Sequence, residues 1–307
     1  MTSNVGHETV LTVPSLDRAT RRGRDGRPFI LALVLVAAAF TPALADVDTE
    51  HMFGFSEGTD IGEPGQPEGE LETVGRTGKV SGSYTALTTT ANLKYPLSNQ
   101  FRIAPGISFA SYNIANVDGF SDTSTFVFDH AQLEFRWHPL ARETHPFGLT
   151  FVATPYYGPV DPATGAGADS YGIQFIAAMD RALIDDRLFA AFNFVYGLNR
   201  TTTWATGETV DSSALGVSVA ASFRVLPWLF VGAEVRYLQG YNGLALASLT
   251  DQAIYLGPTF YMTLGKGVSL SGAFEPQAWG NATGSIDPLN LTTFDRQQFK
   301  LRLAVDL

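Results

Sequence analysis

The sequence has 307 residues, a formal net charge of −10 and no cysteine, and 16% of its residues are charged. The missing cysteine excludes disulfides, thiolate metal sites and cysteine nucleophiles, and the acidic balance argues against a nucleic-acid partner. Frequent Gly, Thr, Ser, Phe and Tyr favour strands and turns over helices.

The first 45 residues have the pattern of a secretory signal peptide. Five arginines precede the apolar run 29–40, and the small-residue site Pro42-Ala-Leu-Ala45 follows it. The run is too short to span a bilayer as a helix. We therefore expect export and cleavage after Ala45. This removes five basic and three acidic residues and leaves 15 basic and 27 acidic ones.

Residues 46–68 are acidic and rich in Gly and Pro, which predicts an irregular N-terminal arm. From Asp46 to Glu72 the chain has nine carboxylates and no Lys or Arg. One hypothesis makes this arm a plug inside a basic barrel, with Phe53, Phe55, Glu57 and Asp60 as its contacts. The alternative is a solvated periplasmic tail. The acidic spacing matches no calcium loop, so we predict neither a metal nor another cofactor.

Residues 69–307 repeat one pattern of alternating apolar and polar residues followed by turn formers, which predicts a single antiparallel barrel of about twelve strands. Helical periodicity is absent from this region. The segments are longer than ordinary globular strands and suit tilted membrane strands. They lie near 69–79, 82–95, 101–114, 124–138, 147–158, 170–183, 187–203, 211–225, 229–241, 251–264, 268–279 and 294–307.

The connections alternate between a mostly short set and a mostly longer set, as in barrels with short periplasmic turns and longer external loops. Basic residues gather beside the short set and acidic residues beside the long set. Aromatic residues cluster at both strand ends, where membrane barrels carry interfacial girdles. The short set is 96–100, 139–146, 184–186, 226–228 and 265–267, and the long set is 115–123, 159–169, 204–210, 242–250 and 280–293.

The last strand alternates Phe299, Leu301 and Leu303 with Lys300 and Arg302. One face of this strand is therefore apolar and the other charged. We expect the apolar face to contact lipid and the charged face to line a closed lumen. A secreted, soluble β-protein is the alternative.

The signal peptide, the repeated strands and the amphipathic strand ending at Leu307 resemble the bacterial outer-membrane β-barrel class. The resemblance implies a Gram-negative outer membrane, contact with its lipid and lipopolysaccharide, and recognition of the last strand by the barrel-assembly machinery. That strand usually ends in Phe or Tyr, whereas this one ends in Leu307, with Phe299 as its nearest aromatic residue. The layout more loosely resembles the outer-membrane transporter-like proteins grouped with phenol-degradation pathways.

Phasing each strand by its apolar face predicts which charged residues line the lumen. Basic residues outnumber acidic ones in this set, which favours anions, although a paired network that fills a narrow barrel is the alternative. The set is Lys94, Arg102, Glu134, Arg136, Arg224, Glu234, Arg236, Glu275, Lys300 and Arg302.

Catalysis is the weakest of the functional hypotheses. A lipid hydrolase needs a serine beside an oriented histidine, and His130 stands in Asp129-His-Ala-Gln132 without a serine two positions away. We therefore predict a non-enzymatic channel for passive passage of small solutes, selected by pore width and lumen charge. The alternatives are a transporter of hydrophobic or aromatic compounds and an outer-membrane lipid-modifying enzyme.

Overall fold

The computed structural model describes residues 48–282 and 287–307, so the predicted signal peptide lies outside the described residues. No helix in this part of the chain is long and apolar enough to span a membrane. The described chain forms twelve strands: β1 (Glu68–Thr77), β2 (Ser83–Pro96), β3 (Phe101–Ala115), β4 (Thr123–Leu140), β5 (Gly148–Val160), β6 (Gly167–Ile184), β7 (Leu188–Thr203), β8 (Thr209–Leu226), β9 (Leu229–Asn242), β10 (Ser248–Gly265), β11 (Val268–Ala282) and β12 (Gln297–Asp306).

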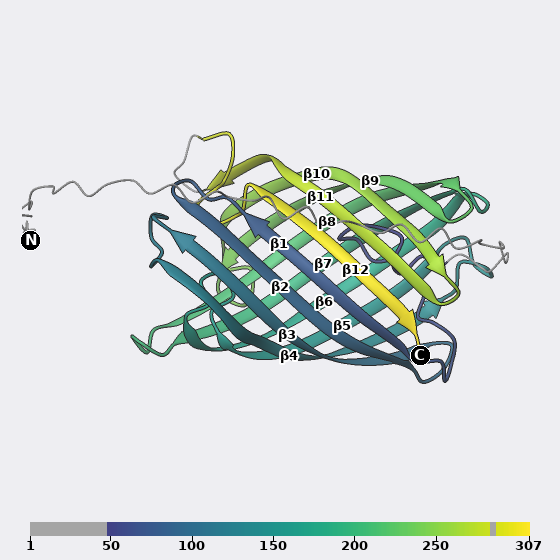
Figure 1. Cartoon of the computed structure of the whole chain (residues 1–307), viewed down its shortest axis with the longest axis horizontal. Helices are drawn as coiled ribbons and strands as arrows, with labels where there is room; N and C mark the ends of the chain where they lie inside the picture. The colour runs from purple at the N-terminus through teal and green to yellow at the C-terminus, as the bar shows by residue number, and fades with distance from the viewer. Residues whose placement is uncertain (1–47, 283–286) are drawn as a thin grey trace, which may run out of the picture. The chain divides into compact units, whose positions relative to one another are not determined.

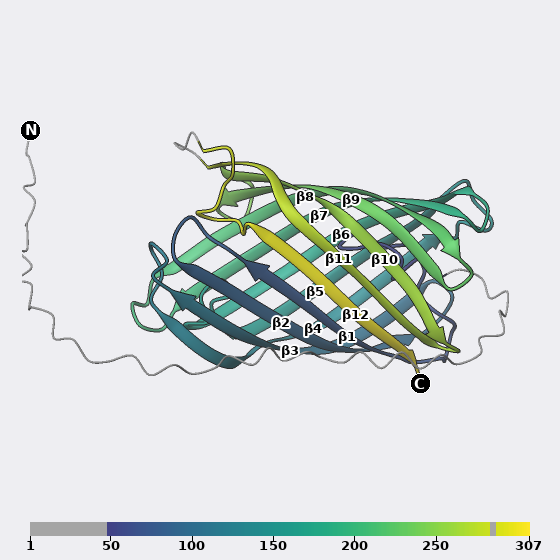
Figure 2. The same cartoon turned by 45° about the horizontal axis from the view of Figure 1, so that its top comes forward.

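The strands form one closed antiparallel barrel (Figure 1). Each strand pairs with its sequence neighbours, and β1 pairs with β12 from Glu68↔Asp306 to Thr77↔Gln297. Closure leaves no edge strand to pair with another chain. The prediction of an all-β barrel of about twelve strands is confirmed. Figure 2 shows the tilt of the strands that closure requires.

Side chains alternate between the two faces of the wall, because successive residues of a strand point in opposite directions. On β12, Lys300 and Arg302 are buried inside the barrel, whereas Leu301 and Leu303 are 46% and 37% exposed on its outer face. Other strands likewise expose large apolar side chains, including Phe135 and Phe151. A band of this kind is the surface that a membrane barrel turns to lipid.

Most connections are shorter than the sequence pattern predicts, because strand pairing continues into the expected loops. The predicted loop 159–169, for example, shrinks to 161–166, since Val160 still pairs with Gly167. The ends of β1 and β12 at Glu68 and Asp306 share one end of the barrel with the connections 97–100, 141–147, 185–187, 227–228 and 266–267.

Candidate functional site: the barrel lumen and its arm

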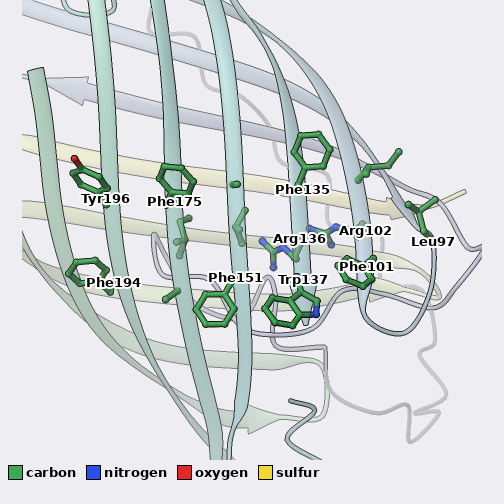
Figure 3. A pocket seen from close by; sticks show the side chains of 15 residues that line it. Leu97, Phe101, Arg102, Phe135, Arg136, Trp137, Phe151, Phe175, Phe194 and Tyr196 are labelled. Carbon is green, nitrogen blue, oxygen red and sulfur yellow. The ribbon is translucent and has the colours of Figure 1, made fainter. Parts of the chain in front are cut away.

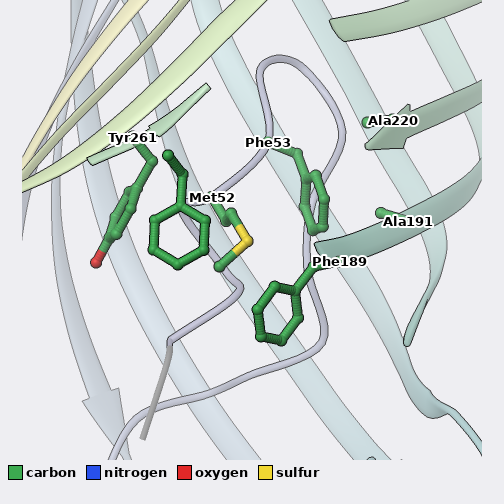
Figure 4. Packing of buried hydrophobic residues seen from close by; sticks show 7 residues of the cluster. Met52, Phe53, Phe189, Ala191, Ala220 and Tyr261 are labelled. Atoms are coloured by element: carbon green, nitrogen blue, oxygen red, sulfur yellow. The ribbon is translucent and has the colours of Figure 1, made fainter. Parts of the chain in front are cut away.

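The arm, residues 48–67, runs inside the barrel before β1 begins. Met52 and Phe53 are fully buried and pack against wall residues from four strands, β7 to β10. Phe189 of β7, Phe230 of β9 and Tyr261 of β10 supply the rings of this apolar cluster (Figure 4). Burying two large apolar side chains in an otherwise polar lumen gives the arm an apolar anchor worth about 1.5–3 kcal/mol for each side chain.

Lumen side chains also hold the backbone of the arm. Glu234 accepts hydrogen bonds from the Phe55 N–H at 2.6 Å and from the Ser56 hydroxyl at 2.8 Å. The Asn193 amide accepts from the Glu57 N–H at 2.6 Å and donates to the Glu57 carbonyl at 2.9 Å. The wall therefore satisfies buried backbone groups that an irregular segment would otherwise leave unpaired.

A third set of contacts fixes the arm near the short-turn end. Asp180 of β6 accepts hydrogen bonds from the Thr59 N–H at 3.0 Å and from its hydroxyl at 2.8 Å, and it also accepts from the Thr49 hydroxyl. Arg142, in the connection after β4, lies 2.6 Å from Asp60. Burial raises the pKa of Asp60 to about 7, with Asp48 and Asp180 adding to the shift and Arg142 opposing it.

Two carboxylates of the arm form ion pairs with cations of the barrel wall. Glu50 pairs with Arg102 through both of its oxygens and with Lys94 at 2.8 Å. Glu57 pairs with Arg302 at 2.9 Å and with Arg136 at 3.2 Å. Burial acts to raise both carboxyl pKa values, but these cations outweigh burial and hold the pKa of Glu50 and of Glu57 well below the usual range.

Carboxylates of the wall share the same cations. Glu134 lies 2.7 Å from Arg102, Glu70 lies 2.6 Å from Lys94, and Glu72 lies 2.8 Å from Arg302. The sequence analysis counted Glu68, Glu70 and Glu72 among the nine carboxylates from Asp46 to Glu72, although its predicted strand near 69–79 already included Glu70 and Glu72. In β1 all three contact lumen cations, and Leu71 between them is exposed on the outer face.

Three of the remaining predicted lumen residues lie around Phe55, which Lys300 also approaches to 5.7 Å. Arg236 stacks on the Phe55 ring at 3.6 Å and pairs with Glu275 at 2.6 Å. Arg224 lies apart from both ion groups, with its guanidinium 4.8 Å from the Phe230 ring. The predicted set therefore divides into three parts. The residues that gather around Glu50 and Glu57 are Lys94, Arg102, Glu134, Arg136, Lys300 and Arg302. Those around Phe55 are Glu234, Arg236 and Glu275, and Arg224 contacts the Phe230 ring instead.

Towards the other end of the barrel, the connection 161–166 reaches across the lumen. The hydroxyls of Tyr84 and Tyr112 donate to the carbonyls of Ala163 and Pro162 at 2.8 and 3.2 Å. Arg76 also donates to the Pro162 carbonyl, at 2.6 Å. This end is therefore narrowed by the β5–β6 loop, which contacts side chains of β1, β2 and β3. The arm occupies the lumen towards the short-turn end.

His130, the histidine considered for catalysis, has partners on both ring nitrogens. Its Nδ1 lies 2.8 Å from Asp129 and its Nε2 lies 3.1 Å from Gln132. The Ser108 hydroxyl donates to Asp129 at 3.4 Å rather than contacting the imidazole. Within residues 48–282 and 287–307, His130 therefore has no serine partner to activate.

Asp48, His51 and Glu68 lie close enough to one another to hold a metal ion. Protein cations already occupy this position. The Lys94 ammonium lies 3.3 Å from His51 Nε2 and 3.1 Å from Glu68, and Arg302 lies 3.2 Å from His51 Nδ1. A divalent cation would have to displace both side chains, so these residues fit an ion-pair network better than a metal site.

The outer face carries an apolar groove of about 610 Å³ across β3 to β7 (Figure 3). Aromatic rings border it, including Trp137, Phe151, Phe175 and Tyr196, while Ala153 leaves room between them. The groove lies on the outer side of the wall, and Arg102 and Arg136, whose side chains belong to the lumen network, also border it.

Comparison with known proteins places the chain in a family. The model of a family of unknown function (DUF6662) matches residues 45–307. The chain belongs to this family. No curated protein matches the sequence.

Two solved structures that resemble this chain are both bacterial β-barrels. The COG4313 outer membrane channel from Pseudomonas putida F1 is 12% identical with a TM-score of 0.56, and the match covers 81% of this chain and 98% of that one. The beta domain of the Bordetella autotransporter BrkA is 14% identical with a TM-score of 0.51, covering 80% and 100%. At such identities the likeness shows the fold alone, which is that of bacterial outer-membrane β-barrels.

Proposed function

We propose that this protein is an outer-membrane channel for passive passage of small solutes, closed at rest by its own N-terminal arm. The observation that carries the proposal is the arm within the lumen, with Glu50 and Glu57 on wall cations. Transport then requires the arm to move aside, after which pore width and lumen charge select the solute. Lipid contacts the exposed apolar band of the barrel.

The lumen charge supports a modest preference for anions. Five wall cations contact the two arm carboxylates, and four wall carboxylates pair with the same cations. Without the arm, this part of the wall therefore has one excess positive charge. The cations are Lys94, Arg102, Arg136, Lys300 and Arg302, and the carboxylates are Glu68, Glu70, Glu72 and Glu134.

A single arm substitution tests closure without changing charge. A Cβ at Gly54 would lie 2.5 Å from Glu234 Oε2 and 2.7 Å from Ala273 Cβ, so Gly54→Val displaces the arm. Overpacking of this kind costs about 1–3 kcal/mol, which predicts an increase in open probability of about tenfold in planar bilayers. The matched control is Gly265→Val, because nothing lies within 4 Å of its added Cβ.

The result separates the two parts of the proposal. If the intact protein and the Gly54→Val variant both show the same high open probability, the lumen is not closed by the arm. If neither protein passes current, the channel function itself is wrong. Across a potassium chloride gradient, the reversal potential of the Gly54→Val variant should have the sign that indicates a higher permeability to chloride than to potassium.

Transport of hydrophobic or aromatic compounds is the second candidate. The outer groove bordered by Trp137, Phe151 and Phe175 favours it, since such rings bind apolar molecules. Uptake of an aromatic hydrocarbon into proteoliposomes that is reduced by Phe151→Glu, with chloride conductance unchanged, would support this candidate over the first.

A further inference from the structure

The arm holds two carboxylates in the way a channel would hold an anionic solute. Both oxygens of Glu50 receive Arg102, in the two-bond geometry that guanidinium groups use for carboxylates. Lys94 adds a third charged donor at 2.8 Å. Arg102 is 2% exposed and Lys94 is 4% exposed, so both donors are buried while the arm occupies the lumen.

Glu57 occupies a second, adjoining position. Its Oε1 accepts from Arg302 at 2.9 Å and its Oε2 from Arg136 at 3.2 Å. Arg136 is 2% exposed and links the two positions, because its Nη1 also lies 3.5 Å from Glu50. One guanidinium therefore bridges two carboxylates at the two ends of the eight-residue stretch Glu50–Glu57 of the arm.

Among the described residues, some donors of the wall cations find their acceptors in the arm. Arg102 Nη1 pairs with Glu50, and Arg136 Nη1 lies near Glu50 and the carbonyls of Gly58 and Asp60. Glu134 pairs with Arg102 through Nη2 and with Arg136 through Nε, whereas Glu57 uses Nη2 of Arg136. When the arm leaves, these donors of Arg102 and Arg136 lose their charged acceptors and face the opened lumen, where another anion can bind them. A solute with one carboxylate satisfies one position, and a solute with two satisfies both.

We infer that the open channel binds small dicarboxylates at the positions that Glu50 and Glu57 occupy in the closed state. The arm is then an internal mimic of the solute, and solute and arm compete for the same wall cations. This inference rests on the proposed function, since the site becomes accessible only when the arm is displaced.

The test uses full-length protein with a displaced and neutralised arm, the variant Glu50→Gln/Gly54→Val/Glu57→Gln. Chloride current through this variant is measured in planar bilayers with added glutarate, butyrate or the neutral diamide glutaramide. We expect glutarate to block at a concentration about tenfold lower than butyrate, because it gains a second set of charged hydrogen bonds. Glutaramide should not block. The Gly54→Val variant keeps Glu50 and Glu57, which compete for the same cations, so a higher glutarate concentration should be needed to block its chloride current.

Two further substitutions in the same background identify the site. Arg136→Gln should abolish the preference for glutarate, because it removes the bridging guanidinium. Arg200→Gln is the matched control, since Arg200 is exposed and pairs with Asp211. If the variant conducts chloride but glutarate and butyrate block equally, or if Arg136→Gln keeps the preference, the dicarboxylate site is wrong and the channel stands. If the variant passes no current, both proposals fail.

Discussion

Titratable residues of the arm carry pKa shifts of opposite sign, because they meet different partners. Cations hold the pKa values of Glu50 and Glu57 below their ordinary value of 4.5. Burial, with Asp48 and Asp180, raises the pKa of Asp60 from 3.8 to about 7. Burial and Lys94 act to lower the pKa of His51, but Glu50 and Glu68 outweigh them and raise it above 6.5.

These shifts predict that arm docking is strongest in mildly acidic solution. Groups with lowered pKa values support docking above 4.5, and this support is lost as the pH falls. Groups with raised pKa values support docking at low pH, and this support is lost as the pH rises through about 7 for Asp60. We therefore expect a lower open probability at about pH 5.5 than at about pH 8 in bilayer recordings.

Asp60→Asn provides the control for this pH dependence, because it removes the carboxyl group whose ionisation near pH 7 weakens docking of the arm. The rise in open probability between the two pH values should become smaller in this variant. An intact protein that opens equally at both values would contradict the assignment of these shifts to docking.

Regular alternation indicates which face of a strand each side chain takes. Lys94, Arg102, Arg136 and Arg302 fall on polar positions between apolar ones, and the structure buries all four inside the barrel. The pairing of each cation does not follow from alternation. It depends on the register between strands and on an arm whose path has no periodicity.

Strand β4 shows how one extra residue changes which side chains face the lumen. Ser108 pairs with His130 and Phe109 with Phe128, so Asp129 is a bulge without its own partner. Strict alternation from Leu133 would place Phe126 and Phe128 inside, whereas they are 72% and 38% exposed. Such a shift is invisible in a list of apolar positions, because both registers alternate.

The bulge makes a testable prediction about positions two residues apart. In a regular strand, probes at Phe128 and His130 would share one environment. We expect a bimane on Phe128→Cys to be quenched by brominated lipid about severalfold more than one on His130→Cys, because only position 128 faces lipid. The chain has no native cysteine to interfere. Leu133→Cys and Phe135→Cys should both be quenched, and equal quenching at 128 and 130 would contradict the bulge.

The strand boundaries themselves were predicted to within a few residues, since turn formers interrupt each alternating run. The last strand is the clearest difference, because the pattern begins it at 294 and pairing begins at Gln297. Asp295 instead lies 3.0 Å from Lys79 in an ion pair between connections. A tertiary contact, absent from local sequence, decides that boundary.

For the molecule as a whole, the sequence predicts the barrel but leaves the arm undecided. Closure follows from the number of strands and from their two-faced pattern. An acidic Gly- and Pro-rich segment is equally suited to water and to a basic lumen. The choice depends on Asp180, Asn193 and Glu234, polar residues on three different strands that meet only in the closed barrel.

The most direct test of closure by the arm is a reversible cross-link between arm and wall. The hydroxyls of Ser56 and Ser218 lie 2.6 Å apart, within reach of a disulfide of about 2.05 Å in the Ser56→Cys/Ser218→Cys variant. We expect oxidised protein to stay closed in planar bilayers and to begin opening after reduction. Failure of the cross-link to form, or equal conductance before and after reduction, would contradict a lumen closed by residues 48–67.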